Sequence, residues 1–255
     1  MTLAGITRVI VFYLFLVFIV FFLSSIGAII AYVVIILASV LFILIAKVRP
    51  QAGNPLPGLV TGTLALTATF GLLLLLGGLA VDGLNDDVAI LLLTGIMFQL
   101  FVAVGEEISF RGYILEDLRG QYGLPVAIAL SSVGFALLHV NSMLLLGTNL
   151  ASALIALATI SAAGVLLALL SLRWGLLSAM GFHFAWNFLQ YHVYGLGLGG
   201  EFSSVVRVTG AANVLMNGGE FGPEASLPGL AVVIITLGIV WYFYKRNSKH
   251  SEHSV

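Results

Sequence analysis

The chain has 255 residues, of which 60% are hydrophobic and only 8% are charged. Such a composition leaves too little polar surface to cover a water-soluble core, so it predicts a polytopic membrane protein. The net charge of −1 argues against nucleic acid as a partner, and the absence of cysteine excludes disulfides, a thiol nucleophile and thiolate metal sites.

Eight apolar stretches are each long enough to cross a ~30 Å hydrocarbon core as a helix. The apolar run over residues 9–46 exceeds one crossing, and it breaks at residues 24–27, where two serines and a glycine occur. The first stretch lacks a signal-peptide cleavage site, so it is expected to stay as a span. The expected spans are residues 8–24, 27–46, 58–81, 88–110, 124–142, 149–171, 174–195 and 228–244. They predict an all-α transmembrane helical bundle, with residues 1–255 forming a single membrane domain.

The charges between these spans predict the orientation of the bundle. With a cytoplasmic N-terminus, only Arg207 among the basic loop residues falls outside. The cytoplasmic side then holds Arg8, Lys47, Arg49, Arg119, Arg173, Lys245, Arg246 and Lys249. The positive-inside rule therefore predicts that both termini are cytoplasmic.

A long, glycine-rich loop covers residues 196–227. Loops of this length and composition are either mobile lids or plain linkers, and the sequence alone favours a linker. The tail after Tyr244 is short and polar, and its histidines, His250 and His253, carry no functional signal.

Two adjacent glutamates at the end of the fourth apolar stretch are the most informative polar residues. A carboxylate against lipid is costly, so Glu106 and Glu107 are expected to face a protein interior or a wet cavity. Arg111 lies four residues after Glu107 and so shares its helix face, whereas Glu106 points about 100° away. Glu107 can thus pair with Arg111 while Glu106 stays free to act on water or a ligand. Alone, the three residues also fit a buried ion pair that stabilises helix packing.

Two other spans carry polar groups that can meet the glutamates. His139 lies near the end of the fifth span, and His183 and Asn187 lie four residues apart on one face of the seventh. At 1.5 Å per residue, all of these groups lie roughly 15–21 Å from the inner ends of their helices. The shared depth predicts one cavity lined from three helices. His192, by contrast, lies among Tyr191 and Tyr194 in an interfacial aromatic belt and is interpreted as structural.

Such a cavity can support hydrolysis in two ways. A desolvated Glu106 beside histidine can take a proton from water, with His183 and Asn187 available to hold a tetrahedral oxyanion. Glu106, His139 and His183 equally form a His₂Glu set that can hold a divalent metal such as zinc. The residues leave the metal-free and metal-assisted mechanisms open.

Other designs for the chain can be compared by their motifs. The sequence contains no H-E-x-x-H, G-x-S-x-G or G-x-G-D motif of other membrane proteases. A proton-coupled transporter is the main non-enzyme alternative, because the same side chains can relay protons at mid-membrane. Against it, the chain has no inverted repeat and no paired broken helices.

Three motifs in order resemble one family of membrane proteases. The run Glu106 to Arg111 matches EExxxR, Phe135 to His139 matches FxxxH, and His183 to Asn187 matches HxxxN. Together they resemble the CPBP (Abi, type II CAAX-protease-like) intramembrane endopeptidases, which include CAAX prenyl endopeptidases and bacteriocin-processing or immunity proteins. The motif core covers residues 100–190. The segment 217–226 also resembles the stretch before the last helix of prokaryotic members.

The resemblance implies an activity and a role for each motif residue. Glu106 would activate water with the aid of His139, and His183 and Asn187 would bind the oxyanion or complete a metal site. Glu107 and Arg111 would brace them. The implied partners are the lipid bilayer and a peptide or protein substrate, with lipid-modified and membrane-associated substrates both open. The implied location is the plasma membrane of a prokaryote, and a non-proteolytic immunity protein is a further alternative.

Overall fold

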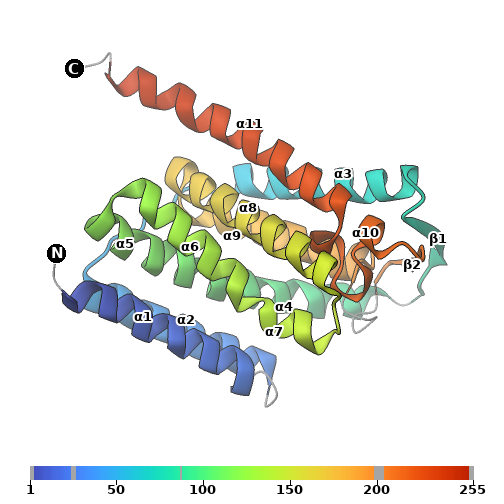
Figure 1. Cartoon of the computed structure of the whole chain (residues 1–255), viewed down its shortest axis with the longest axis horizontal. Coiled ribbons are helices and arrows are strands. Elements are labelled where there is room, and N and C mark those ends of the chain that lie inside the picture. Colours follow the sequence, from blue (N-terminus) through green and yellow to red (C-terminus); the bar gives the residue numbers. More distant parts are fainter. Residues whose placement is uncertain (1–2, 24–26, 87, 198–203, 253–255) are drawn as a thin grey trace.

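The computed structural model describes residues 3–23, 27–86, 88–197 and 204–252. Long helices lie side by side over most of the chain, as Figure 1 shows. The long helices are α1 (Leu3–Phe18), α2 (Ala28–Ala46), α3 (Leu56–Leu75), α4 (Val88–Glu107), α6 (Leu124–Leu138), α8 (Leu150–Trp174), α9 (Leu176–Phe188) and α11 (Leu227–Glu252). The short ones are α5 (Leu115–Tyr122), α7 (Val140–Leu145) and α10 (Val214–Asn217).

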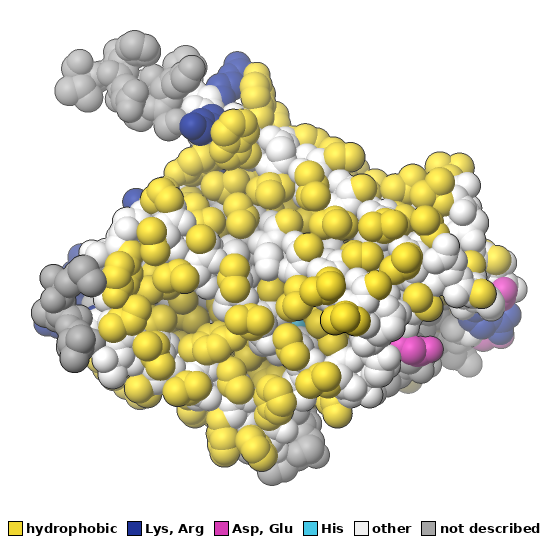
Figure 2. Space-filling model, viewed as in Figure 1, with side chains coloured by type: hydrophobic (Ala, Val, Ile, Leu, Met, Phe, Trp, Pro, Cys, Tyr) yellow, Lys and Arg dark blue, Asp and Glu magenta, His cyan; other side chains and the backbone are white. Residues whose placement is uncertain are grey.

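The surface of this bundle fits a bilayer. Large apolar side chains such as Leu37, Leu44 and Ile90 are more than 60% exposed. Figure 2 shows a broad apolar belt, with charged side chains gathered toward the ends of the long helices. In the described part of the chain, seven helical segments are long and apolar enough to cross a membrane. The predicted all-α, polytopic fold class is therefore confirmed, and the chain is an integral membrane protein.

The eighth expected span, residues 174–195, is helical but differs from the others. It consists of α9 and a π-helical turn, η3 (Leu189–Val193), and it is not among the segments apolar enough to cross by composition. Polar side chains such as His183 and Gln190 are buried in protein along this helix, so lipid does not surround it. The expected count of eight thus becomes seven apolar spans around a more polar central helix.

Small residues bring α9 close to α3. A Cβ atom on Gly62 of α3 would lie 2.6 Å from the carbonyl oxygen of Phe182, and one on Gly181 of α9 would lie 2.6 Å from that of Pro55. No larger residue fits at such distances, so glycine allows the two backbones to touch. This packing holds α9 in the interior of the bundle.

The third span is shorter than expected. The sequence predicts a helix to residue 81, but α3 ends at Leu75, and Gly77 adopts a φ of 68°, which glycine tolerates and other residues resist. Residues Leu79–Leu84 form strand β1, which pairs antiparallel with β2 (Val206–Gly210). The expected helical end at 76–81 is therefore wrong.

Two other expectations concern chain breaks. The first two spans separate as expected, because a π-helical turn, η1 (Ile19–Leu23), ends before α2 begins, although residues 24–26 themselves lie outside the described residues. The loop 196–227 is not a plain linker. It contains β2, α10 and two 3-10 turns, η5 (Gly219–Phe221) and η6 (Pro223–Ala225), while its residues 198–203 are outside the described part. The side chains of Lys249, His250 and His253 are likewise outside it.

Asn217 fastens this loop to the end of α3. Its side-chain amide donates to the backbone oxygens of Ala211 at 2.7 Å and of Gly78 at 3.1 Å. Its carbonyl oxygen accepts from the backbone N–H of Gly219 at 2.9 Å. These bonds fix the backbone that leads into η6 and α11.

Candidate active site

The paired glutamates lie where α4 changes its helical form. At Ile108 the α-helix gives way to a π-helix, η2 (Ile108–Ile114), and α5 then continues to Tyr122. A π-helical segment inserts extra backbone into a turn and is frequent at functional sites. Ser109 supports the transition, because its hydroxyl donates to the carbonyl oxygen of Gly105 at 2.7 Å and lies 2.8 Å from the hydroxyl of Ser39 on α2.

Glu107 is fully buried, and one of its carboxylate oxygens contacts two polar side chains. Its Oε1 accepts a hydrogen bond from Arg111 at 2.9 Å and lies 2.8 Å from Nδ1 of His183. Arg111 is also buried, donates to the carbonyl oxygen of Gly164 at 3.2 Å and lies 4.4 Å from the centre of the Phe135 ring. With Oε1 of Glu107 as the acceptor for Arg111, the imidazole of His183 carries its proton on Nδ1. Its Nε2 then faces the other glutamate.

Glu106 points to a different face of the helix, toward α2 and α9. Its Oε1 accepts a hydrogen bond from the Tyr32 hydroxyl at 2.9 Å, and its Oε2 lies 3.7 Å from Nε2 of His183. Within the described chain Oε2 makes no hydrogen bond, although it is buried. A buried carboxylate oxygen without a hydrogen bond is costly in a folded protein, so a functional reason is expected.

His139 ends α6 at the same cavity. Its Nδ1 lies 2.9 Å from the backbone oxygen of Phe135. A carbonyl oxygen can only accept, so Nδ1 carries the proton and the neutral imidazole leaves Nε2 as an acceptor. The Phe135 ring meets the rings of both His139 and His183 edge to face, which fixes the two imidazoles relative to each other.

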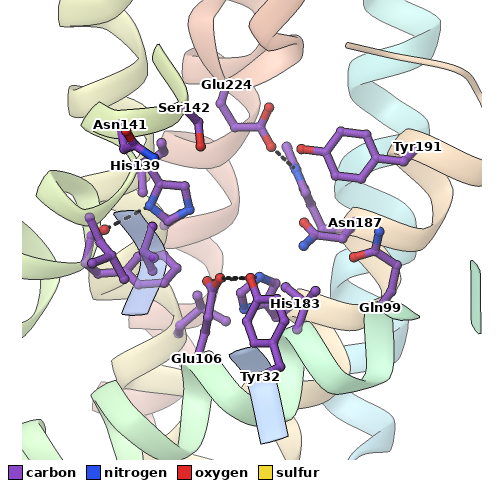
Figure 3. A pocket seen from close by; sticks show the side chains of 18 of the residues that line it. Tyr32, Gln99, Glu106, His139, Asn141, Ser142, His183, Asn187, Tyr191 and Glu224 are labelled. Carbon is purple, nitrogen blue, oxygen red and sulfur yellow. Dashed lines mark hydrogen bonds and ion pairs between the residues drawn. The ribbon is translucent and has the colours of Figure 1, made fainter. Parts of the chain in front are cut away.

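One cavity of about 400 Å³ connects these groups. Glu106, His139, His183 and Asn187 all line it, and Figure 3 shows them around a common space. Its walls are otherwise largely apolar, with side chains such as Ile35 and Leu167. The three expected helices, α4, α6 and α9, therefore contribute to a single cavity. Glu107 and Arg111 lie beneath it and do not line it.

The cavity also contains polar residues that the sequence argument does not assign to the site. They are Tyr32, Gln99, Asn141, Ser142, Tyr191 and Glu224. Tyr32 and Gln99 stand alone in apolar helices, where an isolated polar residue has no spacing signal. Glu224 belongs to the loop before α11, and the resemblance of segment 217–226 to a family stretch was the one available signal for it. His192 donates or accepts in a buried contact with Gln99 at 3.2 Å, in line with a structural role.

Glu224 is the second carboxylate at this cavity. Trp186 donates to its Oε1 at 2.7 Å and Gln190 donates to its Oε2 at 3.0 Å. Burial raises the pKa of Glu224 above its usual value, against the opposing effect of these donors. The loop thus delivers a carboxyl group whose charge depends on what occupies the cavity.

The expected metal ligands do not converge as a metal site requires. In the described part of the chain, no three side chains of His, Asp or Glu lie close enough together to hold a metal ion. One imidazole nitrogen of His183 is taken up by Glu107, and one of His139 by a backbone oxygen. As they lie, Glu106, His139 and His183 do not fit a bound metal, and no step proposed below passes through one.

The arrangement brings proton acceptors and donors together around a space large enough for water and a peptide segment. Glu106 and His139 offer free acceptor atoms, while Asn187 offers hydrogen-bond donors. Water in the cavity can therefore be deprotonated on one side, and an oxygen anion can be held on the other.

Comparison with known proteins adds an independent finding. Residues 88–189 match the family model described as type II CAAX prenyl endopeptidase Rce1-like. The matched segment runs from the start of α4 to the end of α9 and so includes Glu106, His139 and His183. No curated protein and no solved structure matches the chain. Residues 88–189 therefore form an Rce1-like type II CAAX prenyl endopeptidase domain. The family to which this domain belongs consists of CAAX-type intramembrane endopeptidases.

Proposed function

We propose that this chain is an intramembrane endopeptidase in which Glu106 activates water to hydrolyse a peptide bond. The observation that carries the proposal is Oε2 of Glu106, a buried atom that makes no hydrogen bond within the described chain and lies 3.7 Å from His183. A carboxylate oxygen without a partner is free to accept a proton from a water molecule beside it. Tyr32 fixes its orientation through the other oxygen.

In the proposed reaction a water molecule between Glu106 and His139 attacks the substrate carbonyl carbon. One water proton passes to Glu106 as the new carbon–oxygen bond forms, and the carbonyl oxygen becomes an oxyanion. Glu106 then gives that proton to the departing amide nitrogen, directly or through Nε2 of His139, and the carbon–nitrogen bond breaks. The products are a carboxylic acid and an amine, and Glu106 returns to its ionised form.

The oxyanion of the intermediate would be held by Asn187 and His183. Asn187 donates through its side-chain amide, and His183 donates through Nε2 when its imidazole is protonated. The bond from Nδ1 to Glu107 supports that protonated form, and Arg111 holds the Glu107 side chain in place through its own hydrogen bond. Oxyanion donors of this kind typically supply about 3 kcal/mol of transition-state stabilisation each.

Cleavage of a peptide mixture by the purified protein in proteoliposomes, followed by mass spectrometry, tests this proposal. Glu106→Gln, His139→Ala and His183→Ala should each lower cleavage by about 100-fold or more, the contribution of positioned acid–base groups. Glu116→Gln serves as a control on the same continuous helix, because Glu116 only contacts Arg119 at the partly exposed end. Cleavage retained in all three site variants would refute the assignment. Proton flux that depends on Glu106, without any cleavage, would favour the transporter instead.

A second test separates the proposed metal-free mechanism from the metal-assisted one. We expect cleavage to survive treatment with a chelator and the purified protein to hold less than one metal ion per chain, since no three His, Asp or Glu side chains in the described part of the chain lie close enough together to hold a metal ion. Loss of cleavage on chelation, restored by zinc, would establish the metal-dependent alternative.

The proposal extends to the substrate and the membrane. The substrate is a peptide or protein that reaches the cavity from the bilayer, which favours membrane-associated or lipid-modified proteins because the cavity walls are mainly apolar. The chain is proposed to lie in the plasma membrane of a prokaryote with both termini in the cytoplasm. The positions of Arg8, Arg119 and Arg173 near the ends of α1, α5 and α8 support that orientation.

A further inference from the structure

Glu224 occupies an unusual position for a carboxylate that takes no part in the proposed reaction. It comes from the turn η6 before α11, lines the cavity and lies across it from Glu106, as Figure 3 shows. Its Oε1 accepts a hydrogen bond from Trp186, and its Oε2 accepts one from Gln190. A carboxylate has about four acceptor positions, so Glu224 keeps capacity for a further donor from the cavity.

The charges around the cavity are one-sided. Among the described residues that line it, two are carboxylates, Glu106 and Glu224, and none is lysine or arginine. Arg111 lies below the cavity floor and is already bonded to Glu107 and to Gly164. Any positive charge near Glu224 must therefore come from a protonated histidine of the cavity wall or from a bound molecule. A substrate carboxylate in the same place would meet repulsion without a partner.

A second group at the cavity lacks a hydrogen-bond partner. Gln99 of α4 is only 1% exposed and lines the same cavity. Its amide nitrogen lies 3.2 Å from His192, while its Oε1 has no hydrogen-bond partner within the described chain. A buried acceptor without a donor costs about 1–3 kcal/mol, so this oxygen is a place where a donor from a ligand is expected.

From these groups we infer that the cavity contains a specificity subsite for a cationic group of the peptide substrate, in which Glu224 supplies the charge, while Gln99 offers a neutral acceptor elsewhere on the same cavity wall. The inference rests on the proposed endopeptidase function, whose substrate it defines more narrowly. A guanidinium or ammonium group carries several N–H donors and no acceptor, which matches a site made of free acceptor atoms. The peptide would thus present a lysine or arginine side chain, or its amino terminus, to Glu224.

The burial of Glu224 without a neighbouring cation also supports a subsite for a cationic group. Burial raises the pKa of Glu224, so it disfavours the charged form relative to water, and an adjacent cation would favour the carboxylate again. A basic group is therefore the ligand whose binding this residue strengthens most. Asn187 and Tyr191, which also line the cavity, provide hydrogen-bonding groups for the neighbouring peptide backbone.

A binding experiment tests the subsite without requiring turnover. The probes are nonapeptides of alanine and leucine that carry one arginine, moved through each position, together with matched peptides that carry neutral citrulline. They are bound to Glu106→Gln protein in detergent micelles and followed by fluorescence anisotropy. At one or more positions, arginine should bind about tenfold or more tighter than citrulline, as expected for a hydrogen bond between charged groups. N-acetylated copies of each peptide separate a side-chain cation from the amino terminus.

The matched variants assign the effect to one residue. Glu224→Gln, added to the Glu106→Gln protein, keeps an acceptor for Trp186 and should abolish the preference for arginine. Glu220→Gln is the control, because Glu220 is an exposed glutamate in the same loop and does not line the cavity. Equal binding of arginine and citrulline peptides at every position, or a preference that survives Glu224→Gln, would overturn the inference. Cleavage of the neutral peptides by the wild-type protein reports separately on the endopeptidase function, so the two ideas fail independently.

Discussion

Replacement of Arg111 by methionine is the sharpest test of how the site is supported. Arg111 is 1% exposed, Glu107 is fully buried, and the two side chains are 2.9 Å apart. Methionine fills a similar volume but carries no charge. The change therefore leaves Glu107 as a buried carboxylate whose remaining partner is His183 at 2.8 Å.

The size of the effect follows from that loss. Removal of one member of a buried ion pair typically destabilises a protein by about 3–5 kcal/mol. Protonation of His183, or of Glu107 itself, offsets part of this cost, so about 3 kcal/mol is expected for Arg111→Met. The double variant Glu107→Gln, Arg111→Met contains no buried charge at this point and should recover most of the lost stability. It should still cleave about 10–100-fold more slowly, because His183 loses the carboxylate that orients it.

Equilibrium unfolding in mixed detergent micelles, followed by tryptophan fluorescence, measures the stability of the wild type, Glu107→Gln, Arg111→Met and the double variant. Cleavage assays on the same preparations separate stability from catalysis. The reasoning fails if Arg111→Met costs less than about 1 kcal/mol, or if the double variant is no more stable than the single one. Full activity in the double variant would show that His183 needs no support from Glu107.

Three further results are expected. Tyr32→Phe removes the hydrogen bond to Oε1 of Glu106. Because a hydrogen bond to a charged group is lost, kcat should fall about tenfold with little change in thermal stability. An unchanged kcat would contradict this role of Tyr32. Gly62→Leu should sharply lower the thermal stability in detergent because it forces α3 away from α9. Gly71→Leu on the same helix serves as the control, because a Cβ atom at Gly71 has no neighbouring atom within 4 Å. Equal losses of stability would refute the packing argument. The pKa of Glu224 is raised in the folded protein, so its contribution to stability is complete below the unfolded pKa and is lost as pH rises through the folded pKa. Thermal unfolding between about pH 4 and about pH 8 should show a smaller decrease for Glu224→Gln than for the wild type, and identical pH profiles would contradict the raised value.

The sequence predicts most of the fold because apolar helices in lipid have few alternatives. Span positions follow from hydropathy, and the contacts of Glu107 with Arg111 follow from their spacing of four residues. The same rules overextend the third span, since the apolar residues 79–81, which continue the hydrophobic run of α3, belong to strand β1. Periodicity cannot separate a short apolar strand from a helical end.

Other parts of the site have no local signal in the sequence. Glu224 lies 85 residues beyond His139, in a loop whose glycines suggest a linker, and only tertiary packing brings it to the cavity. Tyr32 is one aromatic residue among many in the membrane, and its bond to Glu106 spans 74 residues of the chain. Residues recruited singly from distant helices leave no spacing pattern that a motif search can find.

The π-helix at residues 108–114 has a consequence for how the two halves of its long helix are phased. Above it, Glu106 and Glu107 face α2 and α9, and below it Asp117 accepts from Arg8 of α1 at 3.1 Å. Each α-helical residue turns the chain by about 100°, so deletion of one residue here would rotate Asp117 away from Arg8 or the glutamates away from their partners. The π-helical turns thus rotate the two α-helical parts relative to each other. As a result, one continuous helix places Asp117 beside Arg8 at the membrane edge and the two glutamates at the reaction centre in mid-membrane.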